Sequence, residues 1–410
     1  MQKNWQFGVL FGIPLYIDRS WFVILILITA LDANSPIVQG LAQTSSVAWL
    51  TGFGMALLLF TSVLLHELGH SLVAKSQGIE VKSITLFLFG GIASIERESK
   101  TPYEAFAVAI AGPLVSLLLF VLCWLVSAYT PEASLLHFFA QDISQINLVL
   151  ALFNLIPGLP LDGGQIFKAI IWKFTGDRFK GIRYAAASGK FLGTTAIVLG
   201  LLAVILAGEF GGLWAAMIGW FILRNANAYE RLTDLQSVLM SLTVENTMSR
   251  DFRVIDAHLT LREFADQYVL DLDKKKRIIY ASSEGRYRGL IRPTALQSIE
   301  RSQWETMELI DIAAPLTDIP SVSQQTNLAV VICRLEEIEE NFITVLSPAG
   351  AVAGIIDRGN IVQAIAQEYT IEIPVTELER IRTDRVYPSG FPLVDIAKQL
   401  RQESKAVEAG

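Results

Sequence analysis

LLHELGHSLVA, residues 64–74, places two histidines and a glutamate inside a stretch that is otherwise apolar. In an α-helix, residues four positions apart lie on one face, so His66 and His70 can offer two imidazoles to one ion. Glu67 follows the first histidine, where its carboxylate can take a proton from a water bound to the metal. The pattern predicts a catalytic Zn²⁺ with Glu67 as acid–base, and the alternative is a pair of histidines on a packed helix face.

The composition around this stretch is that of a membrane protein. The chain has 410 residues, of which 52% are hydrophobic and only 18% charged, and its mean hydropathy is positive at +0.44. Apolar runs dominate between residues 21 and 224, and charge is dense after residue 244. Because a transmembrane helix needs about 20 apolar residues, the sequence predicts about six of them, near residues 18–33, 47–70, 103–128, 143–160, 189–207 and 211–225.

The basic residues of this apolar half are distributed unevenly. All 14 of its lysines and arginines lie at the start of the first predicted helix or before it, or after the second, fourth and sixth. The loops near 34–46, 129–142 and 207–211 contain none. Since Lys and Arg gather on the cytoplasmic side of membrane proteins, both termini and the second half of the chain are predicted to be cytoplasmic.

A third metal ligand is expected to be a carboxylate, because a catalytic zinc ion takes three protein ligands and keeps one open position. The stretch FNLIPGLPLDGGQIF, residues 153–167, interrupts the fourth predicted helix with prolines and glycines and carries Asp162. His66, His70 and Asp162 all fall toward the cytoplasmic ends of their spans, which favours Asp162 as the ligand. Its alternative role is a helix N-cap. Asn154 is a candidate for binding substrate or the oxyanion, or for a helix–helix hydrogen bond.

Three motifs together resemble those of a known family. HELGH at 66–70, AGPLVS at 111–116 and NLIPGLPLDGG at 154–164 are similar to motifs of the site-2 proteases, which are intramembrane zinc metalloproteases. The resemblance implies hydrolysis of a peptide bond in or near the transmembrane segment of a membrane-anchored substrate. It also implies that the two histidines and Asp162 are the zinc ligands and that Glu67 is the acid–base.

The segment FLFGGIASIE, residues 87–96, resembles the short membrane-associated hairpin of that family. Its alternating apolar residues and the pair Gly90–Gly91 are typical of a bent strand. A strand edge beside the metal could hold an unwound substrate by β-augmentation. A re-entrant loop that only packs against the helices is an equally good interpretation.

Two similar stretches, residues 244–301 and 308–367, each alternate short strands with helices. They resemble a tandem pair of CBS domains, which often bind adenine nucleotides. The second repeat carries Asp357 and Asn360 where CBS domains contact phosphate and ribose, whereas the first repeat lacks the acidic residue. The pair is therefore expected either to bind an adenine nucleotide or to serve only in dimerisation or substrate gating.

The predicted architecture is an α-helical membrane protein with a short membrane-associated β-hairpin, joined to a cytoplasmic α/β domain of tandem CBS type. Its parts are expected to be a protease domain, a linker, two repeats and a C-terminal extension, at residues 1–225, 226–243, 244–301, 308–367 and 368–410.

The expected function is that of an intramembrane zinc endopeptidase in a prokaryotic cell membrane. Its expected partners are a membrane-anchored protein substrate, the lipid bilayer and, through the repeats, further copies of the chain. The alternative is a CBS-regulated transporter or channel, which explains the spans and the repeats but not HELGH together with LDGG. Residues 244–410 carry 26 acidic and 19 basic residues, so nucleic acid is not an expected partner.

Overall fold

The computed structural model describes residues 5–42, 44–87, 90–269, 278–388 and 392–408. Contacts divide the chain into two units, Met1–Thr233 and Asp234–Gly410. The division lies inside the predicted linker 226–243. Most of that linker is helical, because α8 continues through it as far as Ser241.

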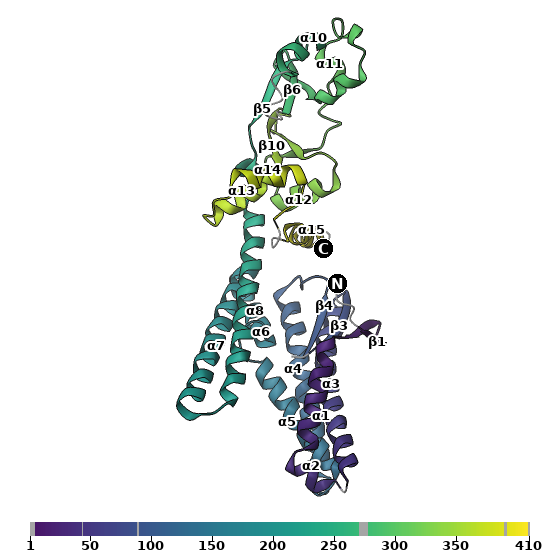
Figure 1. Ribbon diagram of the computed structural model, residues 1–410, viewed down its shortest axis with the longest axis vertical. Coiled ribbons are helices and arrows are strands. Elements are labelled where there is room, and N and C mark those ends of the chain that lie inside the picture. The colour runs from purple at the N-terminus through teal and green to yellow at the C-terminus, as the bar shows by residue number, and fades with distance from the viewer. Residues whose placement is uncertain (1–4, 43, 88–89, 270–277, 389–391, 409–410) are drawn as a thin grey trace. The chain divides into compact units, whose positions relative to one another are not determined.

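The first unit is a bundle of helices with one small sheet (Figure 1). Its elements are β1 Trp5–Leu10, β2 Ile13–Ile17, α1 Arg19–Ala33, α2 Pro36–Leu41, α3 Ser45–Ser76, β3 Val81–Phe87, β4 Gly90–Ile95, α4 Pro102–Ala128, α5 Leu135–Asn154, α6 Asp162–Thr175, α7 Arg178–Ala207 and α8 Gly211–Ser241. Helix α3 packs against α1, α4 and α5, and α4 packs against α5 and α6. The two central helices, α3 and α4, therefore carry the contacts that hold the bundle together.

Four of the described helices are long and apolar enough to cross a membrane, namely α3, α4, α5 and α7. The other two predicted spans correspond to α1 and to the first half of α8. Helix α1 has only 15 residues, and α8 turns polar after Leu223. Four apolar helices are those of a membrane protein, and the count of six stays a prediction.

The fourth predicted span, 143–160, is displaced in the structure. Helix α5 begins at Leu135, because the Ser134 side chain caps it by accepting from the backbone N–H of His137. It ends at Asn154, before the two prolines of the interruption, which cannot donate a helical hydrogen bond. Half of the predicted outer loop 129–142 is therefore helical.

The sheet of the first unit has the strand order β1-β2-β3-β4. Strands β2 and β3 are parallel and the two outer pairs are antiparallel. Strands β3 and β4 form the hairpin predicted for residues 87–96, with residues 88–89 outside the described part of the chain. The backbone pairing of β4 with β3 confirms that this segment is a strand, although Gly90 and Gly91 begin β4 after the turn instead of bending it.

The second unit contains the predicted repeat. Its elements are α9 Val244–Thr247, β5 Phe252–Asp256, α10 Leu261–Phe264, a π-helical turn Ala265–Val269, β6 Ile278–Ser283, β7 Arg286–Ile291, 3₁₀ turns Pro293–Ser298 and Arg301–Gln303, α11 Leu309–Ile312, β8 Ser321–Ser323, α12 Leu328–Glu337, β9 Phe342–Leu346, β10 Val352–Asp357, α13 Arg358–Glu368, α14 Val375–Asp384 and α15 Leu393–Glu408. Each repeat has a three-stranded sheet in which a parallel pair is followed by an antiparallel hairpin. The shared topology confirms an α/β repeat.

The two repeats are interlocked. Ser249, ahead of the first sheet, pairs with Ile355 of the second, and Ala314, ahead of the second sheet, pairs with Leu290 of the first. The fully buried Tyr280 also shares a hydrogen bond of 2.8 Å with the Thr344 hydroxyl across the pair. Burial raises the pKa of Tyr280 to about 12, so its hydroxyl stays protonated.

The C-terminal extension is part of the folded core. Leu378 and Ile381 of α14 and Leu393 and Ile396 of α15 are buried in the same hydrophobic cluster as α12 and α13. The extension thus contributes two helices, α14 and α15, to the second unit.

Removing the Tyr280 hydroxyl should destabilise the second unit. Tyr280→Phe leaves the buried Thr344 hydroxyl without its partner, which costs about 1–2 kcal/mol, or about 2–8 °C in Tm for a unit of this size. The measurement is thermal unfolding of the full-length protein in a Cys123→Ala background. Unfolding is monitored by the reaction of Cys333 with a thiol reagent, because this cysteine is 3% exposed in the folded unit. The double variant with Thr344→Val should recover part of the loss, and purely additive losses would contradict the hydrogen bond.

Candidate metal centre

Helices α3 and α6 bring His66, His70 and Asp162 together. His66 Nε2 lies 3.0 Å from Asp162 Oδ2, His70 Nε2 lies 3.3 Å from the same oxygen, and the two Nε2 atoms are 3.3 Å apart. Both histidines are buried and Asp162 is partly buried. Residues 96 positions apart in the chain thus converge on one point inside the bundle.

The interruption after α5 places Asp162. The chain leaves α5 at Asn154, and Leu161 is the N-cap of α6 with no capping bond from its side chain. Asp162 is the first residue of α6, and its carboxylate contacts the histidines. Asp162 is therefore not the N-cap of α6, because Leu161 occupies that position.

Residues of helix α4 form hydrogen bonds with the Nδ1 atom of each histidine. His70 Nδ1 donates to the carbonyl oxygen of Val108 at 2.7 Å, and His66 Nδ1 lies 2.9 Å from the Ser116 hydroxyl, which is fully buried. A carbonyl can only accept, so the Val108 bond places the ring proton of neutral His70 on Nδ1. The Nε2 electron pair of His70 then points at Asp162.

Gly112 lets α4 come this close. A Cβ atom at this position would collide with His70 Nε2 and would lie 2.7 Å from His66 Nε2. It would therefore fill the space on which the two imidazoles converge. Neither Gly112 nor Ser116 was singled out from the sequence as a site residue, although both lie in the AGPLVS motif at 111–116.

Glu67 lies on the same helix, beside the edge of the sheet. A Cβ atom at Gly91 of β4 would lie 2.5 Å from Glu67 Cγ and 3.5 Å from its Oε1. The backbone of β4 thus passes directly against the glutamate. Asn154 is half-buried at the end of α5, and its side chain has no hydrogen-bond partner within the described residues.

An ion cluster connects the segment after β4 to the helix that carries Asp162. Glu98 Oε2 lies 3.5 Å from Lys168 Nζ on α6 and 3.6 Å from Arg178 Nη1 on α7. Lys168 is 6% exposed, and its charge holds the pKa of Glu98 below its usual range. The cluster therefore ties α6 and α7 to the hairpin.

Asp357 and Asn360, the residues of the second unit that are candidates for binding a nucleotide, form hydrogen bonds with each other. Asp357 Oδ1 accepts from the backbone N–H of Asn360 at 2.7 Å, and the Asn360 side chain accepts from the N–H of Asp357. Asp357 Oδ2 also pairs with Arg382 of α14 at 3.0 Å. The carboxylate of Asp357 is thus occupied by the helix cap and by the C-terminal extension.

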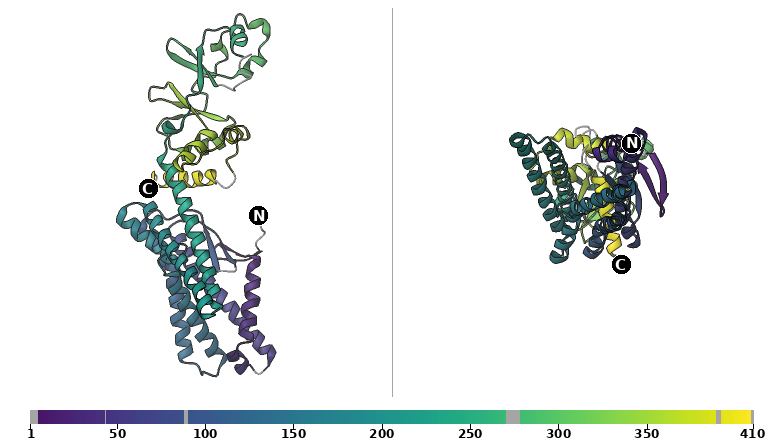
Figure 2. Two further views of the ribbon diagram at one scale, coloured as in Figure 1. Left: turned by 60° about the vertical axis from the view of Figure 1, so that its left-hand side comes forward. Right: turned by 90° about the horizontal axis from the view of Figure 1, so that it is seen from below.

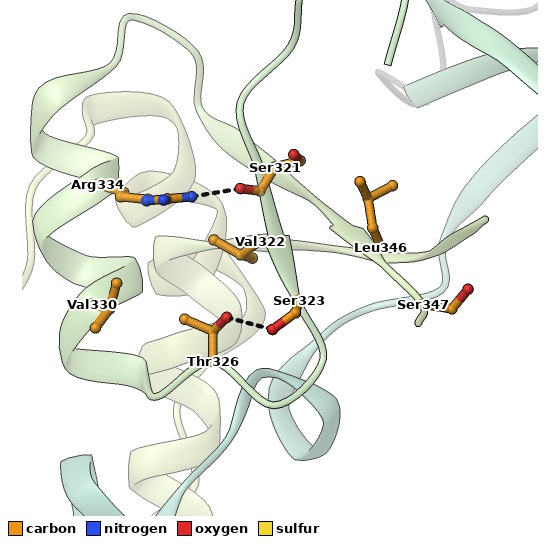
Figure 3. Close-up of a pocket in the computed structure, with 8 residues that line it drawn as sticks. All are labelled: Ser321, Val322, Ser323, Thr326, Val330, Arg334, Leu346 and Ser347. Atoms are coloured by element: carbon orange, nitrogen blue, oxygen red, sulfur yellow. Dashed lines mark hydrogen bonds between the residues drawn. The ribbon is translucent and has the colours of Figure 1, made fainter. Parts of the chain in front are cut away.

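A separate cavity of about 460 Å³ lies beside β8 and α12 (Figure 3). In it, Arg334 donates to the carbonyl oxygen of Ser321 at 2.6 Å, and the Ser323 and Thr326 hydroxyls are 3.0 Å apart. The lining residues are Ser321, Val322, Ser323, Thr326, Val330, Arg334, Leu346 and Ser347. None of them is a predicted site residue.

The chain has relatives along almost its whole length. The family model that matches is that of peptidase family M50, over residues 54–146 and 130–194. Two relatives are each named a putative zinc metalloprotease: sll0528 of Synechocystis sp. is 39% identical over 89% of this chain and 96% of its own, and Rip3 of Mycobacterium tuberculosis is 32% identical over 87% and 92%. The solved site-2 protease from Methanocaldococcus jannaschii is 30% identical, with 56% of this chain and 96% of that chain covered and a TM-score of 0.41.

Gly112→Ala should abolish binding of the predicted zinc ion, because the added methyl group occupies the space between the imidazoles. The measurement is the zinc content of the purified protein. Gly54→Ala on α3 is the matched control, since its Cβ would meet only the Phe139 ring at 3.4 Å, an ordinary contact. Full zinc occupancy in Gly112→Ala would contradict the placement of the metal.

Ser116→Ala should weaken zinc binding about 10- to 100-fold, as is typical when a group that orients a metal-ligating histidine is lost. Ser116→Thr keeps the hydroxyl and should restore much of the affinity. Zinc dissociation constants from chelator competition measure both. Ser127→Ala is the control, because its hydroxyl, also on α4, donates to the Trp124 carbonyl instead. Equal affinities in all of these variants would show that Ser116 does not orient His66.

Proposed function

The chain belongs to peptidase family M50, the site-2 protease family of zinc metalloproteases, and we propose that it cleaves a membrane-anchored protein in or near its transmembrane segment. We assign the zinc ligands to His66, His70 and Asp162. The acid–base is Glu67. The observation that carries the assignment is the convergence of the three ligand atoms beside Glu67.

The chemistry of the donor atoms fits a metal ion. His70 Nε2 directs an electron pair toward a carboxylate oxygen and toward a second imidazole nitrogen, at 3.3 Å from each. Facing electron pairs repel unless a cation or a proton lies between them. The separations of 3.0 to 3.3 Å are close to the edge of about 3.3 Å in a tetrahedron with zinc–ligand bonds of 2.0–2.1 Å.

Glu67 is positioned to move protons. A zinc ion at this site would polarise the substrate carbonyl and lower the pKa of bound water. Glu67, one residue after His66, takes the proton of the attacking water and later delivers it to the leaving amine. Because Glu67 lies in a bundle of apolar helices, the transfer takes place away from bulk water.

The free edge of β4 is suited to hold the substrate. It is an outer strand of the sheet within the described residues, and its backbone passes Glu67. A peptide bond inside a helix is shielded by its own hydrogen bonds, so a substrate must be extended before cleavage. Pairing with β4 would keep it extended beside the acid–base. Asn154 is proposed to bind the substrate or the oxyanion.

The second unit is proposed to be a cytoplasmic regulatory module of CBS type. Its interlocked repeats support a role in controlling substrate access or in forming a homo-oligomer. An adenine nucleotide is the candidate ligand, although Asp357 is already paired with Arg382. The bias of Lys and Arg toward alternate loops supports cytoplasmic termini in a prokaryotic cell membrane.

Glu67→Gln should reduce cleavage about 100- to 10,000-fold while zinc stays bound, because the amide cannot accept the proton. The measurement is an immunoblot of tagged single-span membrane proteins co-expressed with each variant, together with the zinc content of the purified enzyme. Glu96→Gln is the control, since that residue pairs with Lys82 at the far end of β4. Cleavage that persists in Glu67→Gln would refute the proposed mechanism.

A further inference from the structure

The first strand pair carries a dense set of exposed apolar side chains. The β1–β2 hairpin, residues 5–17, projects from the side of the first unit beside α1 (Figures 1 and 2). Trp5, Phe7, Val9 and Phe11 are 49–62% exposed. Large aromatic groups on a free surface are unfavourable in water, and a cluster of them marks a site of contact with a membrane or another protein.

The position of the hairpin is set by two helices of the bundle. Only Asp18 separates β2 from α1, and Trp5 contacts Phe22 of α1 with ring centroids 5.6 Å apart. Lys75, in the last turn of α3, donates to the carbonyl oxygen of Phe11 at 2.6 Å. The hairpin therefore lies at the level where α1 begins and where α3, a candidate span, ends.

Helix α1 is too short to cross a bilayer alone. Its 15 residues extend about 22 Å, whereas the hydrocarbon core is about 30 Å thick. Its surface is nevertheless apolar along its length, with Val23, Ile26 and Leu31 each more than 60% exposed. The hairpin joins this helix near its start, through the contact between Trp5 and Phe22.

The turn of the hairpin places an aromatic residue in an unusual conformation. Phe11 has φ of 51° and is followed by Gly12 at 79°. This left-handed region is costly for a bulky residue and suits glycine or asparagine. Phe11 is mostly uncovered within the unit, where it is 62% exposed. An aromatic side chain held in this way at an exposed tip is explained by a contact outside the unit.

We propose that the β1–β2 hairpin is a membrane-contact surface that inserts its aromatic side chains into the headgroup boundary of the bilayer. Aromatic residues beside Arg19 and Lys75 are the composition of such a boundary. The outer edge of β1 has no partner strand within the described residues. Unpaired backbone groups need water or headgroups, so the hairpin lies at the interface and not in the hydrocarbon core.

Spin labels test this surface in the full-length protein. Phe7→Cys and Phe11→Cys are introduced singly into a Cys123→Ala/Cys333→Ala background and labelled. Each protein is reconstituted into vesicles of phosphatidylcholine and phosphatidylglycerol. Collision with oxygen, which enriches in lipid, is compared with collision with a water-soluble nickel chelate. Zinc content confirms that each labelled protein is folded.

Two further label sites calibrate depth. Leu118 is 58% exposed on the candidate span α4, and Val254 is 46% exposed in the α/β unit. Labels at 7 and 11 should collide with the nickel chelate several-fold less than a label at 254, and with oxygen less than a label at 118. Nickel collisions equal to those at 254 would overturn the proposal. A second result would also overturn it: labels that are shielded from both reagents and show spin–spin broadening that disappears on dilution with unlabelled protein. That result would mean that a second copy of the chain covers the hairpin.

Discussion

The hydrogen bond from His70 Nδ1 to the Val108 carbonyl is the constraint on which the centre of the first unit depends. It fixes the ring so that the other nitrogen faces inward, toward a carboxylate and a second imidazole. Electron pairs that face one another in this way repel, and the proposed zinc ion would relieve that repulsion. Helix α4 can supply this bond only because Gly112 allows it to lie against the two rings. Under the proposed zinc assignment, metal binding depends on the same close packing of α3 against α4.

Much of this centre was predictable, because helical periodicity is a local property. The spacing of His66 and His70 places both on one face, and the interruption after α5 marks Asp162. The capping alternative could be settled only by the structure, since a carboxylate at a helix start suits both roles. Ser116 and Gly112 lie about fifty residues from the histidines, and no periodicity links them. Their roles follow from how two helices pack, which a single sequence does not specify.

The fold was predictable where apolar runs are long. Helices α3, α4 and α7 match predicted spans, and the repeat was visible from its recurring elements. The predicted start of α5 was wrong. Asp142 and the polar residues near it were assigned to a loop, but they belong to the helix that Ser134 caps. The β1–β2 hairpin was missed, yet the alternation of Trp5, Phe7 and Val9 is a strand signal. Asp357 shows another limit: its partner Arg382 comes from the C-terminal extension, outside the repeat.

The four-stranded sheet has a consequence for where a substrate is cut. One of its edges, β1, belongs to the hairpin proposed to lie at the bilayer boundary, and the other, β4, runs past Glu67. Three strand spacings separate these edges, or about 14 Å. With β1 at the lipid surface and a substrate strand on β4, the sheet would fix the distance between that surface and the acid–base. The scissile bond would be chosen by its distance from the membrane boundary as well as by its side chains, and substrates of unrelated sequence would share a cleavage depth.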